Sequence, residues 1–163
     1  MSNSSFRPAG RFQIDHIRDG KVIAKYDMPN GIVDVGLNYI LTTMFNAGSQ
    51  LTAWYIGLIN NASYTALADA DTMSSHAGWI ESSDYSNATR PEWTCGDAAT
   101  RQITNAATVD FNSNATVTMK ALFITSVATK GGTTGTLWAT AAFGSTVALN
   151  SGDTLKVTYT VTG

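Results

Sequence analysis

Hydrophobic residues recur with a helical period in one stretch near the start of the chain, and this stretch follows the turn signal Asn30-Gly31. Its apolar positions share one face of a 3.6-residue period, and they are Val33, Leu37, Ile40, Leu41, Met44 and Phe45. The pattern predicts one substantial helix, at about residues 33–47. We expect this helix to pack Leu37, Ile40, Leu41 and Phe45 against a sheet.

Alternating apolar and polar positions before the helix predict a hairpin. The alternation runs from Arg11 to Asp27 around Asp19-Gly20, and Asp-Gly between two alternating runs favours a tight two-residue turn. We expect Met28 to Gly31 to end this hairpin. After the helix, the nearly all-apolar run 53–59 is typical of a strand that is buried on both faces.

The last third of the chain is patterned as strands, at 115–127, 136–143 and 154–162. In the first, Val117, Met119, Ala121 and Phe123 are expected on one face; the last alternates without error, which is typical of a strand paired inside an antiparallel sheet. Residues 61–107 show little periodicity, with short strands expected near 79–81 or 101–103. The fold predicted from these elements is mainly β, a jelly-roll-like antiparallel β-sandwich with the helix packed on a sheet.

The chain of 163 residues fits a single domain, which we expect to span residues 11–163. Residues 1–10 are rich in Ser and Asn, lack periodicity and predict a flexible N-terminal arm. Its large side chains are Phe6 and Arg7, followed by Pro8. Two interpretations stay open, namely a frayed terminus and an arm that orders on a partner with Phe6 as its anchor.

Charged residues make up only 13% of the chain, and the formal net charge is −2. Nucleic-acid binding depends on clustered Lys and Arg, so this composition argues against a nucleic-acid partner. The start of the chain lacks the apolar region of a secretory signal, and no apolar run is long enough to predict a membrane span. The single Cys95 excludes an internal disulfide and favours a reducing compartment.

Candidate chemistry in the sequence is sparse. His16 falls in a predicted strand and His76 in a loop, and both are interpreted as structural histidines. Asp69-Ala70-Asp71 resembles the start of a calcium loop but lacks the later ligands and the closing Glu. No nucleophile elbow or phosphate-binding loop is present. We therefore expect no catalytic residue, no metal, no cofactor and no enzymatic activity.

Several segments after residue 30 resemble a family of small virion proteins of tailed bacteriophages. The most specific are Trp-Tyr-Ile-Gly-Leu and Thr-Arg-Pro-x-Trp, and the resemblance covers residues 31–41, 54–59, 71–79, 85–93 and 149–159. Similar sequences in short-tailed phages are capsid cement (decoration) proteins with a jelly-roll-like fold, and some relatives are described as tail or fibre proteins. The resemblance implies no catalytic residue that could be transferred to this chain.

The resemblance implies a decoration protein on the outer capsid surface, made in the bacterial host cytoplasm. Its expected partners are the major capsid protein and further copies of itself, as a dimer or trimer. The predicted partner-binding residues are Phe6, Arg7, Pro8, Arg11, Phe12, Trp79, Tyr85, Arg90 and Trp93. A tail, fibre or adsorption component is one alternative. Another is a small carbohydrate-binding module that stacks sugars on Trp54, Trp79, Trp93 and Trp138.

Overall fold

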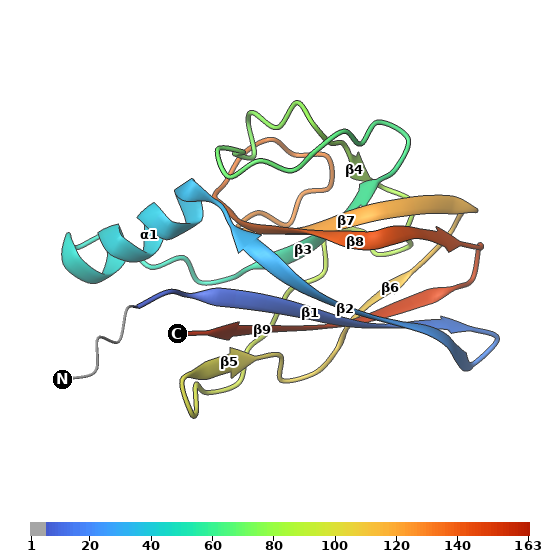
Figure 1. The fold of residues 1–163 in the computed structure, drawn as a ribbon, viewed down its shortest axis with the longest axis horizontal. Helices are drawn as coiled ribbons and strands as arrows, with labels where there is room; N and C mark the ends of the chain where they lie inside the picture. The colour runs from blue at the N-terminus through green and yellow to red at the C-terminus, as the bar shows by residue number, and fades with distance from the viewer. Residues whose placement is uncertain (1–5) are drawn as a thin grey trace.

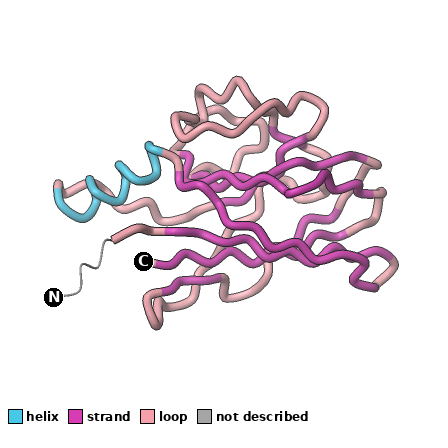
Figure 2. Tube along the Cα trace, in the orientation of Figure 1, coloured by secondary structure: helices cyan, strands magenta, loops and turns pink. Residues whose placement is uncertain are grey.

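The computed structural model describes residues 6–163, which form a mainly β domain with one short helix (Figures 1 and 2). The first five residues of the predicted arm lie outside the described residues. The elements are β1 (Ala9–Arg18), β2 (Lys21–Ile32), α1 (Asp34–Phe45), β3 (Tyr55–Asn60), β4 (Glu81–Ser82), β5 (Gln102–Thr104), β6 (Val109–Asn112), β7 (Val117–Thr125), β8 (Leu137–Leu149) and β9 (Thr154–Thr162). The predicted mainly β fold with one helix is confirmed.

The strands form one open antiparallel sheet of nine strands. Its order is β4-β3-β7-β8-β2-β1-β9-β5, and β6 pairs with β9 beside β5. β9 pairs with β1 along nearly its whole length, so the prediction that the last strand lies inside the sheet is confirmed. The chain between β3 and β7 consists mainly of long loops, with the short strands β4, β5 and β6 among them (Figure 2).

The sheet bends at β2, so its two halves lie one above the other. Figure 1 shows β3, β7 and β8 above β1, β9 and β5, with β2 crossing between the two groups. The main core cluster accordingly joins Phe12 and Leu155 of the lower group to Leu122 and Phe143 of the upper one. Trp138 of β8 donates its indole N–H to the hydroxyl of Tyr159 on β9 across this core, at 2.9 Å.

The hairpin of β1 and β2 has the predicted two-residue turn, with Arg18 paired to Lys21. Asp19 and Gly20 both adopt positive φ, the conformation that a tight hairpin turn requires. The pairing of β1 with β2 ends at Asn30, opposite Gly10, so the prediction that Met28 to Gly31 ends the hairpin is confirmed. The strand itself continues to Ile32, because Gly31 and Ile32 leave β1 and pair with β8.

β7 does not keep the predicted alternation along its whole length. The pairing with β8 shifts between Met119 and Ala121, which marks a β-bulge. Met119 therefore packs in the main core with Leu122, whereas Ala121 and Phe123 pack in a second cluster on the opposite face of the sheet. The predicted common face for these residues is wrong because a single extra residue reverses the alternation.

The helix forms as predicted, but most of its apolar face is not packed on a sheet. The first half of α1 is anchored: Val33 is buried, and Gly36 lies too close to the backbone of Trp138 for any side chain to fit. Ile40 is partly buried against the main core cluster, as predicted. Leu41, Met44 and Phe45 are 52%, 69% and 80% exposed. The prediction that Leu41 and Phe45 contact a sheet is wrong because α1 extends past the end of the strands (Figure 1).

Candidate interaction surface

Most of the predicted partner-binding residues lie in the interior. The residues with at most 7% of their surface exposed are Phe12, Trp79, Tyr85, Arg90 and Trp93. Phe6, Arg7 and Arg11 are exposed, and Pro8 is half-buried. β1 begins at Ala9, so the last two residues of the predicted arm belong to a strand. Among the predicted residues, a surface role is therefore open only to the segment from Phe6 to Arg11.

Arg90 is the centre of a buried polar network. Its guanidinium makes a bidentate ion pair with Glu81, with nitrogen–oxygen distances of 2.6 and 2.8 Å. It also donates to the carbonyl oxygens of Val127 (2.8 Å) and Gly132 (2.9 Å), and the backbone N–H of Gly131 donates to Glu81. Arg90 thus fastens the loop between β7 and β8 to the irregular segment before it.

Trp79 is held by a second polar contact in the same segment. Its indole N–H donates to the carboxylate of Asp71 at 2.9 Å, and the ring of His76 stacks on it with centroids 3.8 Å apart. The Asp71 carboxylate also accepts from the backbone N–H of Ala68. These contacts explain Asp71 and His76 as structural residues, in agreement with the interpretation of His76.

His16 is also structural. Its Nε2 lies 2.8 Å from an oxygen of the buried Asp153, which accepts in addition from the guanidinium of Arg18 and the backbone N–H of Asn150. The hydrogen bonds from Arg18 hold the pKa of the Asp153 carboxyl well below its usual range. This network fastens the turn between β8 and β9 to β1.

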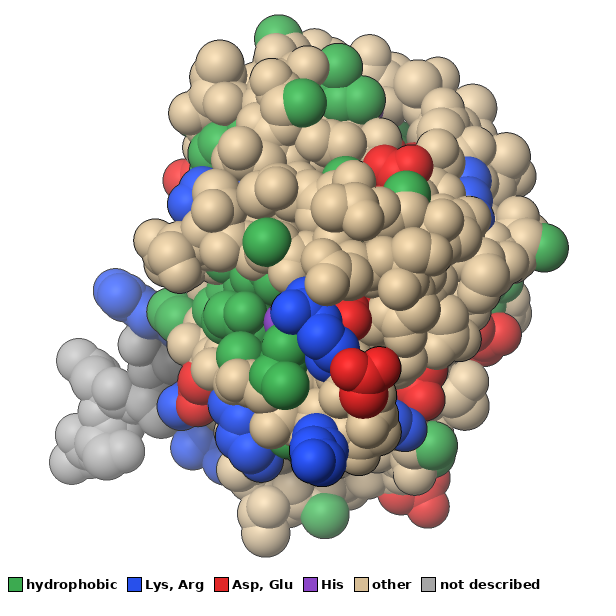
Figure 3. Space-filling model, turned by 90° about the vertical axis from the view of Figure 1, so that its right-hand side faces the viewer, with side chains coloured by type: hydrophobic (Ala, Val, Ile, Leu, Met, Phe, Trp, Pro, Cys, Tyr) green, Lys and Arg blue, Asp and Glu red, His purple; other side chains and the backbone are tan. Residues whose placement is uncertain are grey.

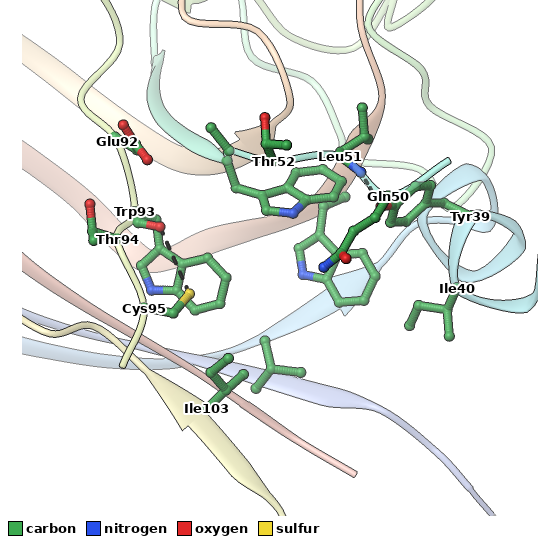
Figure 4. Close-up of a pocket in the computed structure, with 14 residues that line it drawn as sticks. Tyr39, Ile40, Gln50, Leu51, Thr52, Glu92, Trp93, Thr94, Cys95 and Ile103 are labelled. Carbon is green, nitrogen blue, oxygen red and sulfur yellow. Dashed lines mark hydrogen bonds between the residues drawn. The ribbon is translucent and has the colours of Figure 1, made fainter. Parts of the chain in front are cut away.

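The exposed apolar stripe of α1 lies beside a hollow that we call the Trp54 hollow. The hollow has a volume of about 510 Å³. Figure 4 shows Tyr39 and Ile40 of α1 on one side and Trp93 and Cys95 on the other. The remaining walls come from the segment after the helix and from the ends of three strands, and they include Leu51, Trp54, Ile103, Trp138 and Val161.

A second, shallower hollow adjoins the first. Phe6 and Pro8 line it together with Ile40, Ile103 and Val161, and these last three residues also border the Trp54 hollow. Phe6 itself is 65% exposed. We use the term α1 end for the continuous surface made of the two hollows and the exposed side chains of Leu41, Met44 and Phe45.

The helix side of the α1 end lacks charge, whereas Glu92 borders the Trp54 hollow and Arg101 borders the second hollow. No Asp, Glu, Lys, Arg or His occurs between Asp34 and Asp69 in the sequence, and this span includes nearly all of the helix. The opposite end of the molecule, at the β1–β2 turn, displays basic and acidic side chains together with hydrophobic ones (Figure 3). The missing charge was a usable signal in the sequence, because an ordinary surface helix carries charged residues on its polar face.

The side chains that line the Trp54 hollow can make packing and hydrogen-bond contacts with another molecule. The hydroxyl of Tyr39 accepts from the backbone N–H of Leu51 at 2.7 Å, which fixes the segment after the helix. Burial raises the pKa of the Cys95 thiol, so this group stays protonated and unreactive at neutral pH. Across residues 6–163, no group of three or more His, Cys, Asp or Glu side chains is arranged to hold a metal ion.

Three of the four tryptophans proposed as sugar platforms meet at the Trp54 hollow. Trp54, Trp93 and Trp138 line it, whereas Trp79 packs in the second core cluster. Only Trp54 is partly exposed, because Trp93 and Trp138 are 7% and 8% exposed. The indole N–H groups of Trp93 and Trp138 are satisfied inside the protein.

No helix in the described part of the chain is both long enough and apolar enough to cross a membrane. The sequence matches no protein-family model, and no curated protein is significantly similar to it.

Proposed function

We propose that this chain is a bacteriophage capsid decoration (cement) protein, which binds the outer capsid surface and stabilises the virion. The single observation that carries the proposal is the exposed apolar surface of the α1 end, which is suited to contact with other proteins. The sequence resemblance to phage cement proteins supports the same role. The described polar clusters around Arg90, Trp79 and Asp153 serve packing, which favours a binding role over an enzymatic one.

We infer in addition that the bent sheet corresponds to the jelly-roll-like sandwich of the cement proteins that the chain resembles. Two features support this inference. One core cluster contains residues of β1 and β9 together with residues of β7 and β8, and the hydrogen bond from Trp138 to Tyr159 joins strands that are not neighbours in the sheet.

A cement protein stabilises a shell by mass action, because it binds the assembled shell and not the separated subunits. The proposed partners are the major capsid protein and further copies of the chain. The low content of charged residues gives no support to nucleic acid as a partner. Synthesis in the bacterial cytoplasm and placement on the outer capsid belong to this proposal.

The direct experiment compares virions made with and without this protein. Particles that lack it are expected to release DNA at lower temperature and at weaker osmotic shock, and the purified protein is expected to restore both properties. Particles of unchanged stability that fail only in adsorption to the host would contradict the proposal and favour a tail or fibre role.

The arm provides a second test, since Phe6, Arg7 and Pro8 precede the first strand at the α1 end. Removal of residues 1–8 is expected to weaken binding to undecorated capsids at least tenfold, about 1.4 kcal/mol. The melting temperature is expected to change little, because β1 begins at Ala9. Replacing only these three residues with Ser keeps the chain length and serves as the matched comparison. Full-strength binding by both variants would remove the arm from the contact.

A second candidate function is recognition of a glycan, as a tail or adsorption component or as a small carbohydrate-binding module. The specific observation in its favour is the gathering of Trp54, Trp93 and Trp138 around one hollow. Calorimetric titration with host surface glycans tests it. Binding that is lost in Trp54→Ala and kept in Ile80→Ala would support this candidate, since Ile80 is exposed outside the hollow.

A further inference from the structure

The α1 end carries an apolar projection and an apolar hollow side by side. The projection consists of Leu41, Met44 and Phe45, and the hollow next to it is bordered by Ile40 of the same helix. Together with Phe6, these side chains expose on the order of 500 Å² of apolar surface, as much as the largest patch on a typical monomer. Such a patch in water favours an occupant that covers it.

Two properties of the surface decide between the possible occupants. The first is charge: the projection and the helix from Val35 onward carry none, and the charged residues Glu92 and Arg101 lie across the hollows from the helix. A strongly charged partner would therefore lose hydration on the projection and gain no ion pair there. The second is complementarity, because the projection and the hollow lie on one surface of the same chain. A two-fold axis places the projection of each copy opposite the hollow of the other, so every contact is made twice.

The size of the surface fits such a pairing. The hollow, at about 510 Å³, is large enough to receive two bulky side chains of a partner. Two copies that bury their projections in each other's hollows would remove on the order of 1,000 to 1,500 Å² from water, which reaches the range of specific interfaces.

We propose that two copies of this chain associate through their α1 ends, with Met44 and Phe45 of each copy seated in the Trp54 hollow of the other. The contact concerns copies of the chain alone, so it holds whether or not the chain decorates a capsid. The other occupants of this surface, a glycan or a different protein, are outcomes of the test below.

The first experiment measures the mass of the purified full chain by sedimentation from low micromolar to millimolar concentration. The wild-type chain is expected to form dimers, and Phe45→Asp is expected to weaken dimerisation at least tenfold. Ile80→Asp is the matched control, since Ile80 is 57% exposed and lies outside the α1 end. A wild-type chain that stays monomeric throughout would overturn the proposal, and so would Phe45→Asp dimers of undiminished strength.

The second experiment uses the native Cys95 in the wall of the hollow. In Phe45→Cys, mild oxidation at raised pH is expected to form a disulfide between the new thiol of one copy and Cys95 of the other, because the oxidant removes one electron and one proton from each thiol. Peptide mapping identifies the bond, and Ile80→Cys is expected to give none to Cys95. A bond only between two introduced thiols would indicate helix-to-helix pairing and overturn the seating in the hollow.

A glycan titration completes the test. Glycan binding that depends on Trp54, in a chain that remains monomeric, would assign the hollow to a saccharide and overturn the dimer. Capsid binding is measured separately, so a failure of the decoration role leaves the result on self-association intact.

Discussion

Helix α1 and residues 61–107 differ in burial in the opposite way to what their sequence patterns predict. α1 has a regular apolar stripe, yet Leu41, Met44 and Phe45 at its free end are more than half exposed. Residues 61–107 have hardly any periodicity, yet they contribute Trp79, Tyr85 and other fully buried side chains. Regular patterning therefore did not decide which region became part of the interior.

The difference lies in the polar partners. In residues 61–107, several buried polar side chains have a partner nearby: Glu81 faces Arg90, Asp71 faces Trp79, and Asn105 accepts from the indole of Trp93. The buried hydroxyl of Tyr85 is an exception, because it has no hydrogen-bond partner in the described residues. Irregular backbone can be buried when its polar groups are satisfied in this way. The free part of α1 has a satisfied backbone but no covering layer, so its apolar face remains available to a second molecule.

The largest loss of stability is expected from a substitution of Arg90, in the irregular residues 61–107. Arg90→Ala leaves the Glu81 carboxylate buried without its partner and releases the loop carbonyls, so the free energy of unfolding should fall by about 3 to 5 kcal/mol. Urea denaturation measures this change. The matched control is Arg11→Ala, which removes an exposed bidentate pair with Asp27 and should change stability little. Equal effects of the two variants would mean that Arg90 does not organise the region.

Acid is expected to weaken the sheet around Asp153 but not the contacts of α1 beyond Asp34. The pKa of Asp153 is lowered in the folded state. Its contribution to the free energy of unfolding is therefore complete above about pH 5 and is lost as the pH falls below about 4. Asp153→Asn should therefore cost about 3 kcal/mol at pH 7, and the difference from wild type should shrink at pH 3.

Unfolding curves at several pH values measure this effect, with the exposed Asp97→Asn as control. The free part of α1 has no titratable side chain after Asp34 apart from Tyr39, so its contacts should not respond to acid. A difference between Asp153→Asn and wild type that stays constant with pH would contradict the assignment.

Removal of a single indole N–H in residues 61–107 should have an intermediate effect on stability. Trp79→Phe keeps most of the buried ring but removes the donor to Asp71, at an expected cost of about 2 kcal/mol in the free energy of unfolding. Trp54→Phe is the matched control, because the indole of the half-exposed Trp54 donates no hydrogen bond within residues 6–163. If Trp54→Phe costs as much stability as Trp79→Phe, the loss of ring packing and not the loss of the hydrogen bond to Asp71 explains the effect.

The smallest effect on stability is expected at the free part of α1. Leu41→Ala should cost less than about 1 kcal/mol in dilute solution, where the chain is monomeric, because half of the side chain is already in water. Leu122→Ala, at a fully buried position, should cost about 2 to 5 kcal/mol. A large cost for Leu41→Ala would mean that the stripe packs within its own chain.

The sequence predicted the local elements better than their environment. The Asp19-Gly20 turn, the buried run of β3 and the alternation of β9 follow from neighbouring residues, and the structure confirms them. The bulge in β7 and the continuation of β2 through Gly31 and Ile32 depend on pairing with β8, which the local pattern does not contain. The exposure of Phe45 depends on where the strands end, and the chain signalled it only through the missing charge around the helix.

The pairing of β1 with β9 has a consequence for synthesis on the ribosome. Thr162 donates its hydroxyl to the carbonyl of Ala9, 153 residues earlier, so the first strand emerges long before its partner exists. During that interval one edge of the β1–β2 hairpin lacks its neighbour, and an unpaired edge invites association with other nascent chains. Slower translation or a lower growth temperature should therefore not shorten this wait, whereas chaperones that shield strand edges should raise the soluble yield.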